Sequence, residues 1–265
     1  MQVIEWPQFL ENGPRQGERL SSLTVGVFDG VHRGHQALIK RVVSHDNHYV
    51  PTVITFRQNH KKVHTGGRNY PGDIQTLRQK IAVFSQLGLE ITLVVEFTES
   101  FRRMSGAEFL RILHEHGNMG FIAVGSDFRC GYRLDTDARA IQQFYASRSI
   151  PADIVEGIME GSRPVSSSRI RAAITGGKLK EAAHMLGFPF TLDLGGAVDY
   201  SGGRQVYRVA ELGRILPPPG RYPVLFRKTP EDSGTAAEII VDKGTVRVPE
   251  PLAVQCWEFA EFVQY

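Results

Sequence analysis

Cysteine and long apolar runs are both scarce in this chain. The two cysteines, Cys130 and Cys256, lie far apart and match no disulfide or metal-binding pattern, which favours a reducing compartment. No window reaches the roughly 18 consecutive apolar residues of a membrane span, and the N-terminus lacks the apolar stretch of an export signal. We therefore expect a cytoplasmic protein with neither export nor membrane insertion.

An excess of charge is also lacking. The formal net charge is only +3, which suits small anionic substrates but is too weak to indicate a nucleic-acid partner. The contents of 42% hydrophobic and 22% charged residues are ordinary for a globular protein, and 265 residues suffice for two domains. The oligomeric state stays open.

The most informative stretch runs from Leu23 to Val43. It begins as an apolar run typical of a buried strand and continues through three glycines. From Gln36 onward, apolar residues recur at helical spacing. The stretch therefore predicts a strand, a glycine-rich turn and a helix, with His32 and His35 at the turn.

This turn has a chemical use. The first turn of a helix presents unpaired N–H groups and the positive end of the helix dipole, which together favour phosphate. His32 and His35 can donate hydrogen bonds to one anion, and Gly34 between them leaves space for a triphosphate. Two surface histidines near a turn are the plain alternative. The preceding strand and the sequence Phe28-Asp29-Gly30 favour phosphate binding.

The following residues alternate between apolar strands and amphipathic helices. After an irregular or partly helical lead-in over residues 1–20, we expect strands at 49–56, 91–95, 121–124 and 152–155, and helices at 76–87, 105–116, 137–147, 170–175 and 179–186. Ser105 and Glu108 form a capping-box pattern. This alternation predicts an α/β fold with a parallel sheet and helices on both faces. The loops at His32, Arg57 and Asp127 would then converge on one crevice.

A second anion-binding pattern lies between Arg163 and Arg171. Three serines precede a predicted helix and offer a cap and hydroxyl donors, and Arg169 and Arg171 follow in its first turn. An N-cap followed by solvated arginines is the alternative.

The pattern of apolar and polar residues changes after Phe190. Short alternating runs separated by Gly and Pro clusters predict a small antiparallel β domain. We therefore expect domains at 1–190 and 191–265.

Three motifs occur together in order: Gly26–His35, Val124–Gly131 and Val165–Arg171. Each resembles a signature of the prokaryotic FAD synthetases, in their FMN adenylyltransferase module, and the similarity runs from about residue 23 to residue 190. Leu77–Lys80 and Phe97–Phe109 also resemble that family. The resemblance implies the nucleotidylyltransferase variant of the Rossmann-like fold. It further implies transfer of AMP from MgATP to FMN, giving FAD and pyrophosphate, with Mg²⁺ carried by ATP.

The same resemblance implies site residues. His32 and His35 would hold ATP phosphates, and Ser168 and Arg171 would complete the catalytic set, with Ser168 standing where the family usually has Thr. The residues implied to contact substrate are Gly26, Val27, Phe28, Asp29, Gly34, Phe56, Asn59, Gly125, Asp127, Phe128, Arg129, Ser166, Ser167 and Arg169.

Two departures from the family pattern stand out. Gln58-Asn59-His60 replaces the common Pro-His-Pro. The tail lacks the Gly-Phe-Pro-Thr-Ala-Asn stretch of the riboflavin kinase barrel, although Gly220–Phe226 faintly resembles one barrel strand. We therefore expect a degenerate barrel without kinase activity.

Two other functions stay open. One is a catalytically inactive flavin- or nucleotide-binding regulator, and the other is a related nucleotidylyltransferase with another phosphate acceptor. A metal site is not expected, because the spacings of the other histidines fit no tetrahedral set. Trp6 and Trp257 are expected to pack, and Phe128 is the better candidate to lie beside a flavin.

Overall fold

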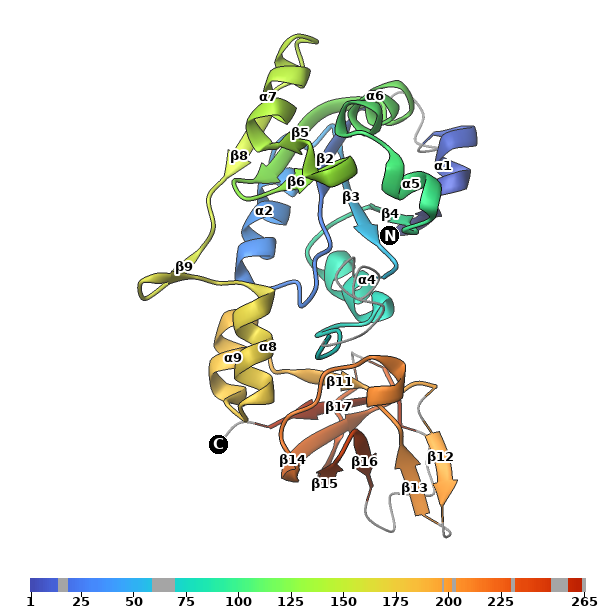
Figure 1. The fold of residues 1–265 in the computed structure, drawn as a ribbon, viewed down its shortest axis with the longest axis vertical. Helices are drawn as coiled ribbons and strands as arrows, with labels where there is room; N and C mark the ends of the chain where they lie inside the picture. The colour runs from blue at the N-terminus through green and yellow to red at the C-terminus, as the bar shows by residue number, and fades with distance from the viewer. Residues whose placement is uncertain are drawn as a thin grey trace. The chain divides into compact units, whose positions relative to one another are not determined.

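The computed structural model describes residues 1–13, 19–58, 70–196, 198–201, 204–229, 232–248 and 257–263. They form two compact units. Figure 1 shows the fold with the chain coloured by residue number. The first unit holds the described residues of Met1–Phe28, Gly34–Val63 and Val83–Met159, and the second holds those of Asp29–Arg33, His64–Ala82 and Glu160–Tyr265. The domain limits at 190 and 191 stay a prediction.

A parallel sheet forms the centre of the first unit. In the described residues it has six strands in the order β1-β4-β3-β2-β5-β8, and every neighbouring pair is parallel. The strands are β1 (Gln2–Glu5), β2 (Ser21–Val25), β3 (Val50–Phe56), β4 (Ile91–Val95), β5 (Met119–Gly125) and β8 (Ala152–Val155). The predicted parallel α/β sheet is confirmed.

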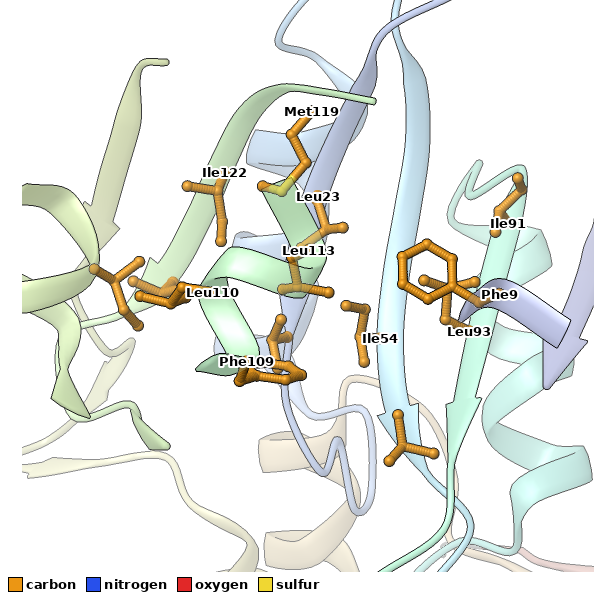
Figure 2. Packing of buried hydrophobic residues seen from close by; sticks show 14 of the residues in the cluster. Phe9, Leu23, Ile54, Ile91, Leu93, Phe109, Leu110, Leu113, Met119 and Ile122 are labelled. Carbon is orange, nitrogen blue, oxygen red and sulfur yellow. The ribbon is translucent and has the colours of Figure 1, made fainter. Parts of the chain in front are cut away.

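Helices cover both faces of this sheet, as expected. Leu23 and Ile54 belong to one buried cluster with residues of α1 (Trp6–Asn12), α6 (Gly106–His116) and α7 (Ala138–Ala146). Figure 2 shows this cluster, with Phe9 of α1 and Leu113 of α6 labelled. On the opposite face, the Ser22 hydroxyl donates to the Val42 carbonyl of α2 (Arg33–Val43) at 2.9 Å. The first unit also contains α5 (Glu99–Arg103), β6 (Arg129–Cys130), η1 (Tyr132–Leu134) and β7 (Thr136–Asp137). The helix α4 (Leu77–Gln86) begins in the second unit and ends in the first.

The capping box of α6 is confirmed. The Ser105 hydroxyl accepts a hydrogen bond from the Glu108 N–H at 3.2 Å, and the Glu108 carboxylate accepts one from the Ser105 N–H at 2.9 Å. Two donors that the helix leaves without partners are thereby satisfied, so α6 begins where the sequence predicts.

The prediction for residues 1–20 was incomplete. They contain β1 as well as α1, and β1 pairs with β4 through registers such as Ile4 with Leu93. Only one residue of β1 is buried, so its own sequence lacks the apolar pattern of a central strand. The predicted loop after β5 also contains β6, which pairs with β7.

The second unit combines helices with an antiparallel sheet. Its helices are α8 (Ser167–Thr175) and α9 (Leu179–Leu186), preceded by the short strands β9 (Met159–Glu160) and β10 (Arg163–Pro164). In the described residues, seven antiparallel strands follow the order β11-β17-β14-β15-β16-β13-β12. Their bounds are β11 (Thr191–Asp193), β12 (Val198–Ser201), β13 (Arg204–Tyr207), β14 (Gly220–Arg227), β15 (Thr235–Asp242), β16 (Thr245–Arg247) and β17 (Phe259–Phe262), with η2 at Ala210–Leu212.

The second sheet confirms the predicted antiparallel β region, which begins at Thr191. Both tryptophans pack in cores as expected: Trp6 lies 5.2 Å from Phe9, and Trp257 lies 5.2 Å from Phe226, between ring centroids. Within the described part of the chain, no helix has the length and apolar character that crossing a membrane requires.

Candidate active site

The turn that joins β2 to α2 has an unusual backbone. Phe28 and Val31 have φ values of 52° and 27°, a region that non-glycine residues rarely adopt, and Gly30 between them has a φ of 90°. Such conformations persist only where the surrounding contacts hold them, and they are common at functional sites. The contacts around this turn therefore decide how its two histidines are presented.

Aromatic packing supports the His35 end of the turn. His35 lies in the first turn of α2, and its ring meets the Phe28 ring edge-on at 5.0 Å between centroids. Phe28 is 1% exposed and meets Phe84 edge-on at 5.6 Å. Phe28, a predicted substrate residue, thus packs in the protein interior and orients His35. The neighbouring Val27 carbonyl accepts a hydrogen bond from the Thr55 hydroxyl at 3.2 Å.

His32 is buried, with 6% of its surface exposed. Burial lowers the pKa of its imidazole to about 4. A hydrogen bond to its own backbone opposes this shift only partly. The ring is therefore neutral near pH 7 and adds no positive charge. Gly34, between the two histidines, lies half-buried in the first turn of α2.

Asp29 lies three residues before His32, and contacts within the protein surround its carboxylate. One oxygen accepts hydrogen bonds from the Ile74 N–H at 2.9 Å and the Gln75 N–H at 3.1 Å. The other oxygen forms an ion pair with the Arg171 guanidinium. Asp29 thus joins the turn to two segments far away in the sequence, and its contact with substrate stays a prediction.

Arg171 is buried rather than projecting into solvent, so the solvated-arginine interpretation is wrong for this residue. Besides Asp29, its guanidinium donates to the Gly72 carbonyl at 3.0 Å and the Tyr70 hydroxyl at 3.1 Å, and it lies 5.3 Å from the Tyr70 ring centroid. These partners fix the guanidinium in one orientation.

The three serines that precede Arg171 have different surroundings. The Ser166 hydroxyl caps α8 by accepting from the Arg169 N–H at 3.4 Å, and the Ser167 hydroxyl donates to the Asp29 carbonyl at 2.8 Å. Ser168 is exposed in the first turn of the helix. The Arg169 guanidinium donates to the Arg163 and Pro164 carbonyls at 3.0 and 2.8 Å. The structure thus brings the serine–arginine segment to the histidine turn.

Other predicted residues lie at the carboxyl edge of the parallel sheet. Since β3, β2 and β5 are neighbours, Phe56, Gly26 and Gly125 end or follow adjacent strands. The Phe56 ring stacks on Phe97 at 4.4 Å between centroids. A Cβ added to Gly26 would lie 3.0 Å from the Phe28 ring, so a larger residue would crowd that ring.

The loop after β5 contains the remaining predicted residues. It turns through a hydrogen bond from the Phe128 N–H to the Gly125 carbonyl at 3.0 Å. Phe128 is half-buried against the apolar core of the first unit, while Asp127 and Arg129 are exposed. Asn59 lies outside the described residues.

Sequence reasoning missed the contributions of Tyr70, Ile74 and Lys80. Lys80 is buried beside Asp29 and Asp73, and burial lowers its pKa to about 8, while the attraction of the two carboxylates opposes the shift. The family likeness of Leu77–Lys80 was the available signal, but it assigned no chemistry to the lysine. Within the described residues, no group of three or more His, Cys, Asp or Glu side chains could hold a metal ion.

Comparisons with known proteins bear on this arrangement. The FAD synthetase family profile matches residues 15–169. The bifunctional riboflavin kinase/FMN adenylyltransferase of Escherichia coli strain K12 is 27% identical over 243 residues, which cover 91% of this chain and 74% of that protein. The protein of the same name from Listeria monocytogenes is 30% identical over 171 residues, which cover 64% of this chain and 54% of that protein.

A solved structure shares the fold. A crystal structure described as a macrolide-efflux protein from Streptococcus pneumoniae matches with a TM-score of 0.78 and 22% identity, covering 99% of this chain and 89% of that one. At this identity the likeness shows the fold alone. The profile match extends over more than half of the chain and includes the histidine turn and the start of α8. The chain therefore belongs to the FAD synthetase family, whose curated relatives are named as FMN adenylyltransferases, a class of nucleotidyltransferase.

Proposed function

We propose that this protein is an FMN adenylyltransferase that makes FAD and pyrophosphate from FMN and MgATP. A phosphate oxygen of FMN forms a bond to the α-phosphorus of ATP, and the bond from that phosphorus to the bridging oxygen of the β-phosphate breaks. The observation that carries the proposal is the attachment of the serine–arginine segment to the histidine turn through Asp29. Family membership identifies the reaction class.

The two histidines have different surroundings and therefore different proposed contributions. His32 is uncharged and is proposed to contact a phosphate oxygen, while His35 lies in the first turn of α2, at the positive end of the helix dipole, which favours phosphate. Such a transfer depends on positioning and on stabilising the charge that develops on pyrophosphate. Since His32 adds no charge, Mg²⁺ bound to the ATP phosphates would supply much of the neutralisation.

The proposal gives the other residues distinct functions. Ser168, which is exposed, is proposed to donate its hydroxyl to phosphate, whereas Arg171 is proposed to act through Asp29 by holding the turn. The carboxyl-edge residues of the parallel sheet, together with Asp127, Phe128, Arg129 and the undescribed Asn59, are proposed to contact FMN or ATP. We also propose a cytoplasmic location, the reducing compartment that the scarcity of cysteine favours.

We include the absence of riboflavin kinase activity in this proposal. Its support is the missing Gly-Phe-Pro-Thr-Ala-Asn stretch between β11 and β14, where the chain instead has short strands and η2. Riboflavin with MgATP should therefore give no FMN.

The direct test separates the two activities. FMN and riboflavin are each incubated with MgATP, and flavin products are identified by chromatography; FAD from FMN alone is the expected result. H32A and H35A should each lower kcat by about 10²–10³, the usual cost of removing one charge-stabilising donor. H48A is the matched control, because the His48 side chain is 93% exposed. Near-normal turnover in both H32A and H35A would contradict the mechanism.

Two outcomes would favour the other functions. Binding of ATP and FMN without FAD formation would indicate a regulator, which the Gln58-Asn59-His60 departure motivates. Transfer to pantetheine phosphate or glycerol phosphate in preference to FMN would indicate a different acceptor.

A further inference from the structure

Residues Gly72–Gln79 form a segment, here named the bridging segment, that contacts two parts of the second unit. One set of its backbone groups holds the ion pair beside the histidine turn. The Gly72 carbonyl accepts from Arg171 at 3.0 Å, and the Ile74 and Gln75 N–H groups donate to Asp29 at 2.9 and 3.1 Å.

Asp73 and the residues after Gln75 contact the antiparallel β region. The Asp73 N–H donates to the Gly213 carbonyl at 2.8 Å, and the Asp73 carbonyl accepts from the Ile215 N–H at 3.1 Å. The Gln79 side chain donates to the Thr191 carbonyl of β11 at 2.8 Å. Since both sets of contacts lie within eight consecutive residues, we expect displacement of one set to displace the other.

Asp193 is the centre of the second set. Its side chain is 1% exposed and accepts from the Thr76 hydroxyl at 2.5 Å and from the Arg78 Nε at 2.6 Å. Arg214 reaches the same carboxylate at 3.4 Å and donates to the Asp193 carbonyl at 2.5 Å. Although burial alone would raise the pKa of Asp193, the hydrogen bonds from Arg78 and Thr76 hold it below its usual value.

We propose that Asp193 is a positioning residue for adenylyl transfer: it fixes the bridging segment, which fixes Asp29 and hence the turn that carries His32. This inference rests on the proposed function, because its kcat measurement requires that the protein makes FAD. It assigns the antiparallel β region a function that does not require kinase chemistry. The β region would hold the histidine turn in its strained conformation.

The test compares D193N with E261Q. Glu261 lies on β17 and forms an ion pair with Arg227 at 3.1 Å. E261Q therefore also removes a paired carboxylate of the same sheet, but one whose ion-pair partner lies outside the bridging segment. D193N should lower kcat for FAD formation by about tenfold or more, with KM for ATP changed less, because small displacements of catalytic groups mainly slow the reaction. E261Q should leave kcat within about twofold of wild type.

Amide hydrogen exchange gives a readout independent of catalysis. In D193N, the Ile74 and Gln75 amides should exchange about tenfold faster than in wild type, while E261Q leaves them unchanged. Assays are run well below the lowest Tm of the set. A D193N protein with lowered Tm but unchanged kcat and unchanged exchange at these two amides would overturn the proposal.

A milder variant covers the case in which D193N fails to fold. T76V removes one hydroxyl hydrogen bond to Asp193 and should give smaller changes in the same direction; wild-type kcat and wild-type exchange in T76V would overturn the proposal. If the wild-type protein makes no FAD, the proposed function fails, and the exchange comparison alone decides whether Asp193 fixes the bridging segment.

Discussion

The two ends of the turn between β2 and α2 are supported in contrasting ways. At its His35 end, the rings of Phe28 and Phe84 provide apolar packing. At its His32 end, Asp29 is held by a guanidinium and two backbone N–H groups. Apolar contacts tolerate small shifts and changes of partner, whereas a buried ion pair needs both members in place. The polar end should therefore be the more sensitive to substitution.

Removal of Arg171 should have the largest effect. R171M leaves the Asp29 carboxylate buried without its counter-ion, which should lower the free energy of unfolding by about 3–5 kcal/mol. Urea denaturation measures the change. R103M breaks an ion pair whose side chains are 73% and 75% exposed and should cost less than about 1 kcal/mol. The double variant D29N/R171M should recover part of the loss; equal costs for R171M and R103M would remove the contrast.

Lowering the pH should reduce the free energy of unfolding, because His32 is buried at the polar end of the turn. Because its pKa is lowered to about 4 in the native state from 6.5, the unfolded state binds more protons between these pH values, so stability falls as pH falls through this window. Between pH 7 and pH 4.5, wild type should lose about 2 kcal/mol more than H32N, which lacks the titrating group. Urea titrations at several pH values test this, and parallel pH profiles for the two proteins would contradict it.

Replacement of Phe84 should reduce the free energy of unfolding less than removal of Arg171. F84L removes the ring that packs on Phe28 but keeps an apolar side chain at a fully buried position, so we expect a loss of about 1–3 kcal/mol. The loss should add to that of R171M in the double variant, since Phe84 packs on Phe28 whereas Arg171 pairs with Asp29. Thermal denaturation of both single variants and the double variant tests this additivity. Strong coupling would show that the two supports act as one.

Removal of the helix cap at Ser105 should reduce the free energy of unfolding least. S105A removes the hydroxyl that caps α6 and should destabilise the protein by about 1 kcal/mol. E108Q keeps a side chain that can still accept from the Ser105 N–H and serves as the milder control. A loss as large as that of R171M would contradict the view that short-range contacts contribute less than the buried pair.

The separation along the sequence between contacting residues explains which features the sequence could predict. The capping box and the strand Ile91–Val95 depend on neighbouring residues, and both were predicted correctly. The strand β1 was missed because it is defined by pairing with β4 rather than by its own pattern. Pro7, at the start of α1, was the available signal for the helix that follows it.

For the candidate site, the sequence identified residues but not their partners. Asp29 and Arg171 were both selected, yet their ion pair joins positions 142 residues apart, and no periodicity encodes that distance. Phe28 was expected at a substrate, and its burial follows from the backbone turn, which only the fold specifies. The roles of the individual site residues stay predictions.

The separation of Asp29 from Arg171 has a consequence for synthesis on the ribosome. At translation rates of about 5–20 residues per second, about 7–30 s pass between the addition of Asp29 and the addition of Arg171. During that interval, the nascent histidine turn has no counter-ion from α8 to fix its conformation. The phosphate-binding corner should therefore mature late, after the parallel strands that precede it have already emerged.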